Sequence, residues 1–379
     1  MQVVDLVRTV SILVVLAIHL AGPQIITKAS QSYWENFIWY KVWVAGAFGV
    51  SMFFVISGFL ITRLIASNPR GLFNPDFRDF YSRRFGRIIP LLALICLIGI
   101  ILIGFVKTQS RAFEVCFHNP QNGSFSPWTW GSIATFSFNW YKIITESAGN
   151  ASGLHWDVLW SLSIEEQFYF LYPFVLKTLG NRRNLSLFLA ALVIAGPISI
   201  LLLRNLLPHS QLLGQNSFAG FNLIALGCLL YLVSNRFEKT LLRRKKTSFF
   251  LCLFGFFLFL DAYIHQDYRA DVEGHFLEPT LIGLGVFFFL LGGLHLDFFE
   301  SRILAPLAWP GKLSYGGYLL HVTVLFFLWP FLSGLNEFLA FFLFAAGTFT
   351  AASISYRFYE LPANYFFRRV LGRPHKKGA

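Results

Sequence analysis

The chain has 379 residues, of which 55% are hydrophobic and only 13% are charged, whereas soluble proteins carry about 25% charged residues. With 45 Phe and 10 Trp, this composition excludes a soluble domain and predicts an integral membrane protein. The formal net charge of +12 does not predict nucleic-acid binding, because the basic residues cluster in short segments between apolar runs, where they set membrane topology.

Apolar segments of roughly 17–25 residues predict an all-α, polytopic membrane helix bundle of about ten transmembrane helices. Basic residues fill every second connection, so the positive-inside rule predicts that both termini are cytoplasmic. We expect a transmembrane domain over 1–362 and a basic cytoplasmic tail over 363–379. The first segment lacks a small-residue cleavage site, so we expect it to be retained. The segments lie near 3–21, 42–66, 88–106, 160–179, 185–207, 217–234, 248–265, 279–296, 313–331 and 336–359.

The first segment carries the most informative pair of residues, Arg8 and His19. Their spacing of eleven residues is close to three helical turns, so both side chains share one helix face, roughly 16 Å apart along the axis. A cation and an imidazole are costly to place in lipid, so we expect both to face a protein interior or a watery cavity. The alternative is that Arg8 reaches the cytoplasmic surface and His19 the opposite one.

The second segment contains the sequence GVSMFFVISGFLI at 49–61, with Ser51, Ser57 and Gly58. Small residues of this kind allow two membrane helices to pack closely. A glycine also allows a ligand chain to approach the backbone. The sequence leaves both interpretations open.

Three arginines, Arg83, Arg84 and Arg87, precede the third segment. Arg84 and Arg87 are three residues apart and would share a helical face, with Arg83 beside it. Guanidinium groups bind phosphates bidentately, so the cluster predicts a site for a polyphosphate ligand at the cytoplasmic surface. The alternative is an anchor on anionic lipid headgroups.

The loop 107–159 is the longest connection predicted outside the membrane, and connections of this length are often functional. Its aromatic stretch 128–144 predicts an interfacial or re-entrant helix. The tryptophans of this stretch would either stack on sugar rings or form an aromatic belt at the membrane surface. The connection 261–278, on the same side, is acidic.

The fourth segment opens with Glu165, Tyr169 and Tyr172, which follow helical spacing on one face. A carboxylate that enters a membrane needs a partner or water. His19 ends the first segment on the same outer side, so a His19–Glu165 pair is geometrically allowed and would orient a general base. The alternative is that Ser161 caps the helix and the glutamates occupy its first turn, where the helix dipole favours them.

The ninth segment begins with Ser314, Tyr318 and His321, which lie on one helical face. The segment starts from the cytoplasmic side, so His321 lies part-way into the bilayer. It is either part of a site or a buried histidine that satisfies a structural hydrogen bond.

Taken together, these segments resemble the acyltransferase-3 family of integral membrane acyltransferases over 5–362. The resemblance rests on six motifs in the expected order. They are Asp5 and Arg8 with ten residues before His19, GVSMFFVISGFLI at 49–61, RRFGRIIP at 83–90, WSLSIEEQFY at 160–169, LSYGGYLLH at 313–321 and YELP at 359–362.

The resemblance implies an enzyme that moves an acyl group, often acetyl, from cytoplasmic acyl-CoA to a hydroxyl of a sugar in lipopolysaccharide, peptidoglycan, exopolysaccharide or a lipid-linked precursor. A bacterial inner membrane fits this family best. No spacing of Cys and His residues suggests a metal site. The resemblance implies no cofactor beyond the acyl-CoA donor. It also implies a member without a fused extracellular hydrolase-like domain, so the chain either completes the transfer or hands the group to a partner.

Carried over by position, His19 is the central catalytic histidine, either as a general base or as the carrier of the acyl group, and Glu165 is its acidic partner. Arg8 lines the same cavity, and the three arginines at 83–87 bind the phosphates of CoA. We expect Ser314, Tyr318 and His321 to line the substrate site. His155 stands further from Trp160 than the family's histidine usually does, so the resemblance assigns it no role.

A different class of function is a carrier or flippase for a lipid-linked glycan or an amphipathic metabolite, since many transporters are multi-span bundles with polar residues near the midplane. Two features favour the enzyme. The halves of the chain show no sequence symmetry, and the polar residues at the segment ends are of acid–base types.

Overall fold

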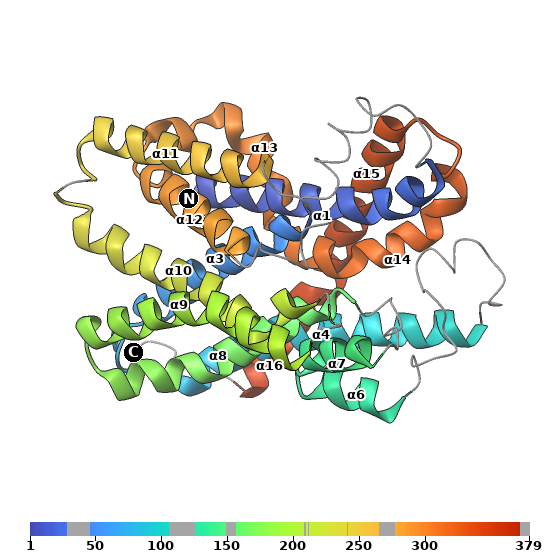
Figure 1. The fold of residues 1–379 in the computed structure, drawn as a ribbon, viewed down its shortest axis with the longest axis horizontal. Coiled ribbons are helices and arrows are strands. Elements are labelled where there is room, and N and C mark those ends of the chain that lie inside the picture. Colours follow the sequence, from blue (N-terminus) through green and yellow to red (C-terminus); the bar gives the residue numbers. More distant parts are fainter. Residues whose placement is uncertain are drawn as a thin grey trace.

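The computed structural model describes residues 1–28, 46–105, 126–148, 157–207, 210, 212–240, 242–264 and 277–371. Within these ranges every regular element is a helix, which confirms the all-α prediction (Figure 1). Most of loop 107–159, including His155, most of the acidic connection 261–278, and the tail from 372 onward lie outside the described residues.

Each of the ten predicted segments coincides with a helix. Eight helices in the described part of the chain are long and apolar enough to cross a membrane, and they support a multi-pass protein. Of the other two, α12 is shorter and α8 carries two adjacent glutamates. The α-helices are α1 (Gln2–Lys28), α3 (Gly46–Ala66), α4 (Phe77–Phe105), α6 (Pro127–Ala134), α7 (Phe138–Ser147), α8 (Leu159–Leu179), α9 (Arg182–Leu206), α10 (Ser217–Phe237), α11 (Lys245–Ile264), α12 (Glu278–Gly293), α13 (Ala305–Lys312), α14 (Ser314–Leu332), α15 (Glu337–Ser355) and α16 (Leu361–Leu371). A π-helical turn, Tyr356–Glu360, joins α15 to α16.

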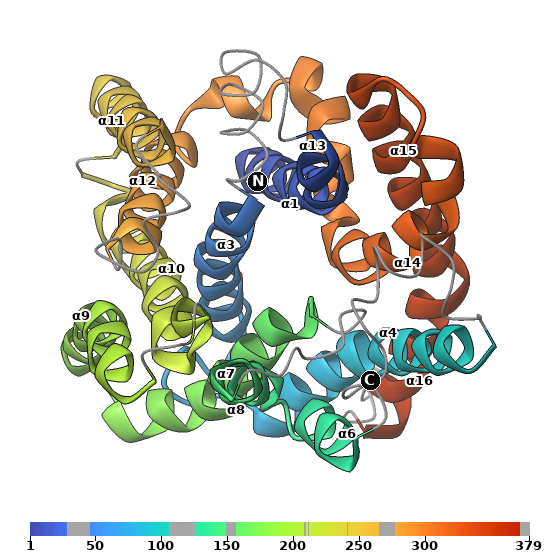
Figure 2. The same ribbon diagram turned by 45° about the vertical axis from the view of Figure 1, so that its right-hand side comes forward.

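The bundle has an inner and an outer set of helices. Figure 2 shows α1 and α3 inside a ring formed by the other helices. In the apolar stretch of α3, 72% of the residues are buried, against 17% in α11. The outer helix α11 exposes Phe250, Phe254 and Phe257, which suits contact with lipid. Arg8 and His19 are therefore carried by an inner helix, as predicted.

The crossing of α3 and α10 depends on glycine. A side-chain carbon at Gly58 would collide with the carbonyl oxygen of Ile224, and one at Gly227 would collide with the carbonyl oxygen of Val55. The two backbones are therefore in direct contact, which is the close packing that small residues allow between membrane helices. Of the two interpretations left open for Gly58, the structure supports the packing one.

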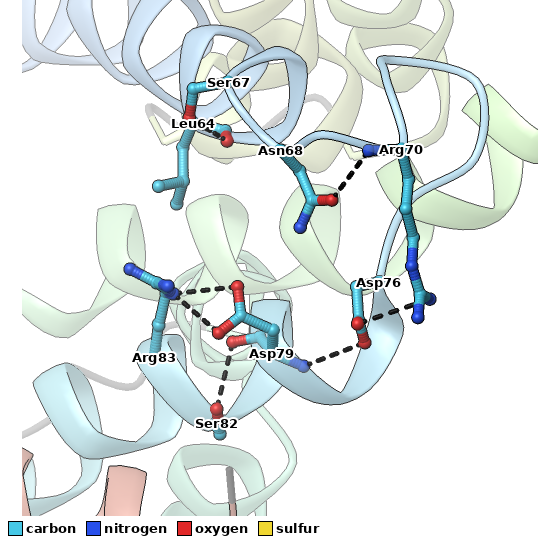
Figure 3. A network of polar contacts seen from close by, with 8 residues as sticks. All are labelled: Leu64, Ser67, Asn68, Arg70, Asp76, Asp79, Ser82 and Arg83. Atoms are coloured by element: carbon cyan, nitrogen blue, oxygen red, sulfur yellow. Dashed lines mark hydrogen bonds and ion pairs between the residues drawn. The ribbon is translucent and has the colours of Figure 1, made fainter. Parts of the chain in front are cut away.

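Helix α4 begins at Phe77, eleven residues before the predicted start of the third segment at 88. The backbone N–H of Asp79 donates a hydrogen bond to Oδ1 of Asp76 (3.3 Å). This bond satisfies a donor that the first turn of a helix otherwise leaves unpaired. Asp76 also forms an ion pair with Arg70 (3.3 Å; Figure 3). The arginines at 83–87 therefore lie on a formed helix rather than in a loop.

The chain continues as a helix beyond 362, the predicted end of the transmembrane domain. Helix α16 packs along α4, where a side-chain carbon at Gly86 would lie 3.1 Å from Cβ of Phe367. Tyr359 donates a hydrogen bond to the carbonyl of Pro90 (3.1 Å), within the same contact. Residues 363–371 thus belong to the helical bundle.

Candidate active site

A cavity of about 120 Å³ lies at the meeting point of α1, α3, α4, α8 and α14. We call it the arginine cavity, because Arg8, Arg84 and Arg87 all line it. Its other polar lining residues are Ser57, Ser161, Glu165, Tyr169, Ser314, Tyr315 and Tyr318. The sequence motifs on five separate helices therefore converge on one site.

Arg84 is held by an aromatic ring. Its guanidinium carbon lies 3.7 Å from the centroid of the Tyr169 ring, and the hydroxyl of Tyr169 hydrogen-bonds to Ser57 of α3. A guanidinium stacked on an aromatic face keeps its in-plane N–H groups available to a ligand. The buried Nε of Arg84 has no hydrogen-bond partner among the described residues. The described residues thus leave this donor unpaired beside the cavity that Arg84 lines.

Arg8 ties α1 to α14. Its Nε donates to Oγ of Ser314 (3.2 Å), and its Nη1 forms an ion pair with the carboxylate of Asp5, one turn earlier (3.3 Å). Arg87 lies 5.3 Å from the centroid of the Tyr315 ring. The prediction that Arg84 and Arg87 share a face is confirmed, since both line the arginine cavity.

Arg83 does not line the arginine cavity. Its Nε donates to both carboxylate oxygens of Asp79, each at 2.9 Å, and its side chain is 40% exposed (Figure 3). One residue step turns a helix by about 100°, so Arg83 faces away while Arg84 faces in. Of the three arginines expected to bind one ligand, Arg84 and Arg87 line the arginine cavity and Arg83 does not.

Glu165 lies in the arginine cavity rather than beside His19. It hydrogen-bonds to Ser57, and its carboxylate interacts electrostatically with all three arginines of the cavity, most strongly with Arg84. The expected His19–Glu165 pair is therefore not what the structure shows. Tyr318 of α14 bonds to Ser161 of α8, and Glu165 lies one helical turn further into α8, on the cavity side of that contact.

His19 instead lies against His321. The two rings meet edge to face, with centroids 4.6 Å apart and an angle of 78° between their planes. Nδ1 of His19 bonds to the carbonyl of Val15 (2.8 Å), and Nδ1 of His321 to the carbonyl of Tyr318 (2.6 Å). A carbonyl only accepts, so in each ring the proton lies on Nδ1 and Nε2 carries the basic lone pair.

The Arg8–Ser314 and His19–His321 contacts are the two ends of one line along α1 and α14, which we call the α1–α14 seam. The prediction that Arg8 and His19 share a helix face is confirmed, since both meet α14. The sequence predicted that His19 ends the first segment. Helix α1 instead continues to Lys28, so His19 lies within the helix.

Tyr318 stands between the two ends of the seam. Its ring lines the arginine cavity, and its centroid lies 5.7 Å from that of His321. The hydroxyl of Tyr318 hydrogen-bonds to Ser161 (2.7 Å) and donates to the carbonyl of Val158 (3.1 Å), both in the first turn of α8. The predicted grouping of Ser314, Tyr318 and His321 on one face therefore connects the cavity to the histidines.

The charged groups that face His19 are Asp157 and Lys142, and neither was predicted as a site residue. They form an ion pair (3.4 Å) in which the side chain of Lys142 is only 6% exposed. Lys142 is the single charged residue of the aromatic stretch 128–144. A lone cation in such a stretch was the available signal, because a buried lysine needs a paired acid.

The stretch 128–144 forms two short helices, α6 and α7, which are pinned to the bundle by polar contacts. Gln167 of α8 donates to the carbonyl of Phe136 (2.6 Å) and to Asn139 (3.0 Å). Trp140 donates to Oγ of Ser217 in α10 (2.8 Å). Trp140 therefore serves as a structural contact, and α7 holds Lys142 in place beside Asp157.

Residues 1–357 match the model of the acyltransferase domain family, and this range includes every site residue described above. The chain belongs to this acyltransferase family. The resemblance to the acyltransferase-3 family is thereby confirmed, and no solved structure is matched by the chain.

Three curated relatives of this acyltransferase-family chain are bacterial proteins. It is 30% identical to the peptidoglycan O-acetyltransferase OatA of Listeria monocytogenes, over 96% of this chain and 56% of that protein. It is 28% identical to the O-acetyltransferase OatA of Staphylococcus aureus, over 89% and 56% of the two proteins. It is 29% identical to the putative peptidoglycan O-acetyltransferase YrhL of Bacillus subtilis, over 87% and 52%. The chain thus spans about half the length of these relatives.

Proposed function

We propose that this chain is a plasma-membrane O-acetyltransferase that moves an acetyl group from acyl-CoA to a hydroxyl of a cell-envelope glycan. The observation that carries the proposal is the α1–α14 seam, which has the Arg8 guanidinium at one end, in the arginine cavity, and paired imidazoles at the other. The similarity to peptidoglycan O-acetyltransferases favours acetyl as the group and peptidoglycan as the first acceptor to test.

The arginine end suits the donor. Arg8, Arg84 and Arg87 offer planar donors to phosphate oxygens, and Phe53 and Phe54 give the same cavity an apolar wall for the pantetheine arm. Phosphates bind at the predicted cytoplasmic side, and the thioester extends toward Tyr318 and the histidines.

The histidine end suits the chemistry. Nε2 of His19 takes the proton of the acceptor hydroxyl while its oxygen attacks the thioester carbonyl carbon. The C–S bond breaks, the acetyl group becomes an ester on the acceptor oxygen, and the imidazolium returns its proton to the departing thiolate. The products are the acetyl ester and CoA thiol. General-base catalysis of this kind contributes about 10²–10⁴-fold to the rate.

The test uses purified protein in nanodiscs with acetyl-CoA and soluble peptidoglycan fragments. CoA thiol release and acetyl ester on the glycan are measured together. We expect both from the wild type and from Arg83→Ala, and neither from His19→Ala. Absence of turnover in the wild type, or full turnover in His19→Ala, contradicts the proposal. Movement of glycan across a bilayer without CoA release supports a carrier instead.

A further inference from the structure

A second cavity of about 390 Å³ lies next to the arginine cavity and is about three times as large. The two share Arg8, Arg87 and Tyr315, so these residues stand at the boundary between them. The second cavity is otherwise enclosed by the α13–α14 junction, the end of α15, the π-helical turn and α16. A ligand that enters the arginine cavity from this side passes through the larger space first.

The second cavity is cationic. Arg8, Arg87 and Lys312 line it, and Glu360 is its only acidic lining residue within the described part of the chain. Glu360 accepts a hydrogen bond from Ser355 (3.0 Å), its neighbour across the π-helical turn. Three cations against one carboxylate suit a multiply charged anion, and one of the three, Lys312, is exposed.

The π-helical turn shapes one wall of the second cavity. Such turns are rare and are often found at functional sites. Here the turn brings Glu360 next to Gly316 of α14, where a side-chain carbon would lie 3.0 Å from Oε1 of the glutamate. Asn364, one turn further along, adds an amide to the same wall. Neither Lys312 nor Asn364 has a role in the transfer chemistry above.

We propose that the second cavity binds the phosphate-bearing nucleotide end of the acyl-CoA donor, with Lys312 and Asn364 as phosphate contacts. This inference rests on the proposed function. The narrow arginine cavity then receives the diphosphate at its arginines and the extended pantetheine arm beyond them, and Arg8 and Arg87 stand where the two parts of the donor join. An anionic lipid headgroup carries the same phosphate chemistry, so the test separates the two sources.

The experiment compares acetyl-CoA, 3′-dephospho-acetyl-CoA and acetyl-pantetheine as donors in nanodiscs of neutral lipid. The test variant is Lys312→Gln with Asn364→Ala. The matched control is Arg302→Gln, which removes an exposed cation just before α13 that lines neither cavity. We expect the KM for acetyl-CoA to rise about tenfold in the test variant, the effect of losing a charge-assisted hydrogen bond. The KM for acetyl-pantetheine and both kcat values stay within about twofold of the wild type.

An unchanged KM for acetyl-CoA, or an equal rise for all three donors, overturns the inference. An effect that depends on added anionic lipid assigns the cavity to a lipid headgroup and also overturns it. Binding of adenosine 3′,5′-bisphosphate is measured separately by calorimetry. If the wild type binds this nucleotide and the test variant does not, the cavity is a nucleotide site even where acetyl-CoA gives no turnover. In that event only the proposed function fails.

Discussion

At one end of the α1–α14 seam Arg8 contacts Ser314, and Arg84 and Arg87 of α4 lie near it against tyrosine rings, whereas at the other end the imidazoles of His19 and His321 meet. Helices α1 and α14 reach both ends, and α4 adds cations at the first. A guanidinium stays protonated at every physiological pH and holds an anion, but it cannot accept a proton. An imidazole with its proton on Nδ1 accepts a proton at Nε2. In the proposed mechanism, α1 and α14 therefore place donor binding and proton transfer at opposite ends of the seam.

The largest expected effect comes from removing the imidazole of His19. His19→Ala is expected to lower kcat by about 10²–10⁴-fold, because the general base is lost. The KM for acetyl-CoA is expected to stay unchanged, since the arginine cavity is intact. Steady-state kinetics in nanodiscs separate the two constants. A large rise in KM with little change in kcat would assign His19 to donor binding.

The second largest effect is expected for Arg84→Ala, and Arg83→Ala, its neighbour in the sequence, is the control. Arg84→Ala is expected to raise the KM for acetyl-CoA by about tenfold or more, because a stacked guanidinium that faces the donor is lost. Arg83→Ala should stay within about twofold, because Arg83 pairs with Asp79 outside the cavity. Equal effects in both variants would mean that the cluster acts only through its total charge.

The Lys142–Asp157 pair tests the histidine end through the stability of the protein. Lys142→Met removes the buried cation that pairs with Asp157 beside His19, and we expect thermal unfolding in nanodiscs to show a loss of about 1–3 kcal/mol. The double variant with Asp157→Asn should recover part of this loss. The exposed Lys245–Asp297 pair is the matched control, with an expected loss of about 0–1 kcal/mol. No coupling in the double variant would show that the 3.4 Å contact contributes nothing.

Glu165→Gln is expected to have the smallest effect. It tests whether Glu165 acts on the arginine cavity or serves as the partner of His19. In the arginine cavity, loss of the carboxylate frees Arg84 for an anion, so the KM for acetyl-CoA is expected to fall about two- to threefold. The value of kcat should stay within about threefold. A hundredfold loss in kcat at constant KM would instead mean that Glu165 serves His19, as its place in the sequence suggested.

The helices and the shared face of Arg8 and His19 could be predicted from the sequence, because apolar length and helical period are local properties. The partner of His19 could not. It depends on the offset of α8 and α14 relative to α1, and the contacts that accompany this offset, such as Tyr318–Ser161, join segments far apart in the sequence. The spacing of Glu165 within its own helix carries no information about this offset.

The arginine cluster shows the same limit on a smaller scale. The sequence predicted a phosphate site, but not that Arg83 turns to Asp79 while Arg84 turns inward, because the start of α4 was placed at 88. Lys142 and Asp157 were missed for a related reason. Each sits in a separate stretch of an outside loop, and only the docking of α7 on α8 brings them together.

The position of Tyr318 determines how often the arginine cavity is open toward His19 and His321. Its hydroxyl engages Ser161 and Val158, so turning the ring aside breaks two hydrogen bonds, each worth about 1 kcal/mol net. At about 1.4 kcal/mol per factor of ten, the open arrangement holds a few per cent of the molecules. A bound thioester would then spend most of its lifetime sealed from water on the acceptor side. The enzyme would lose little donor to hydrolysis, and the frequency of ring motion would set an upper limit on its turnover.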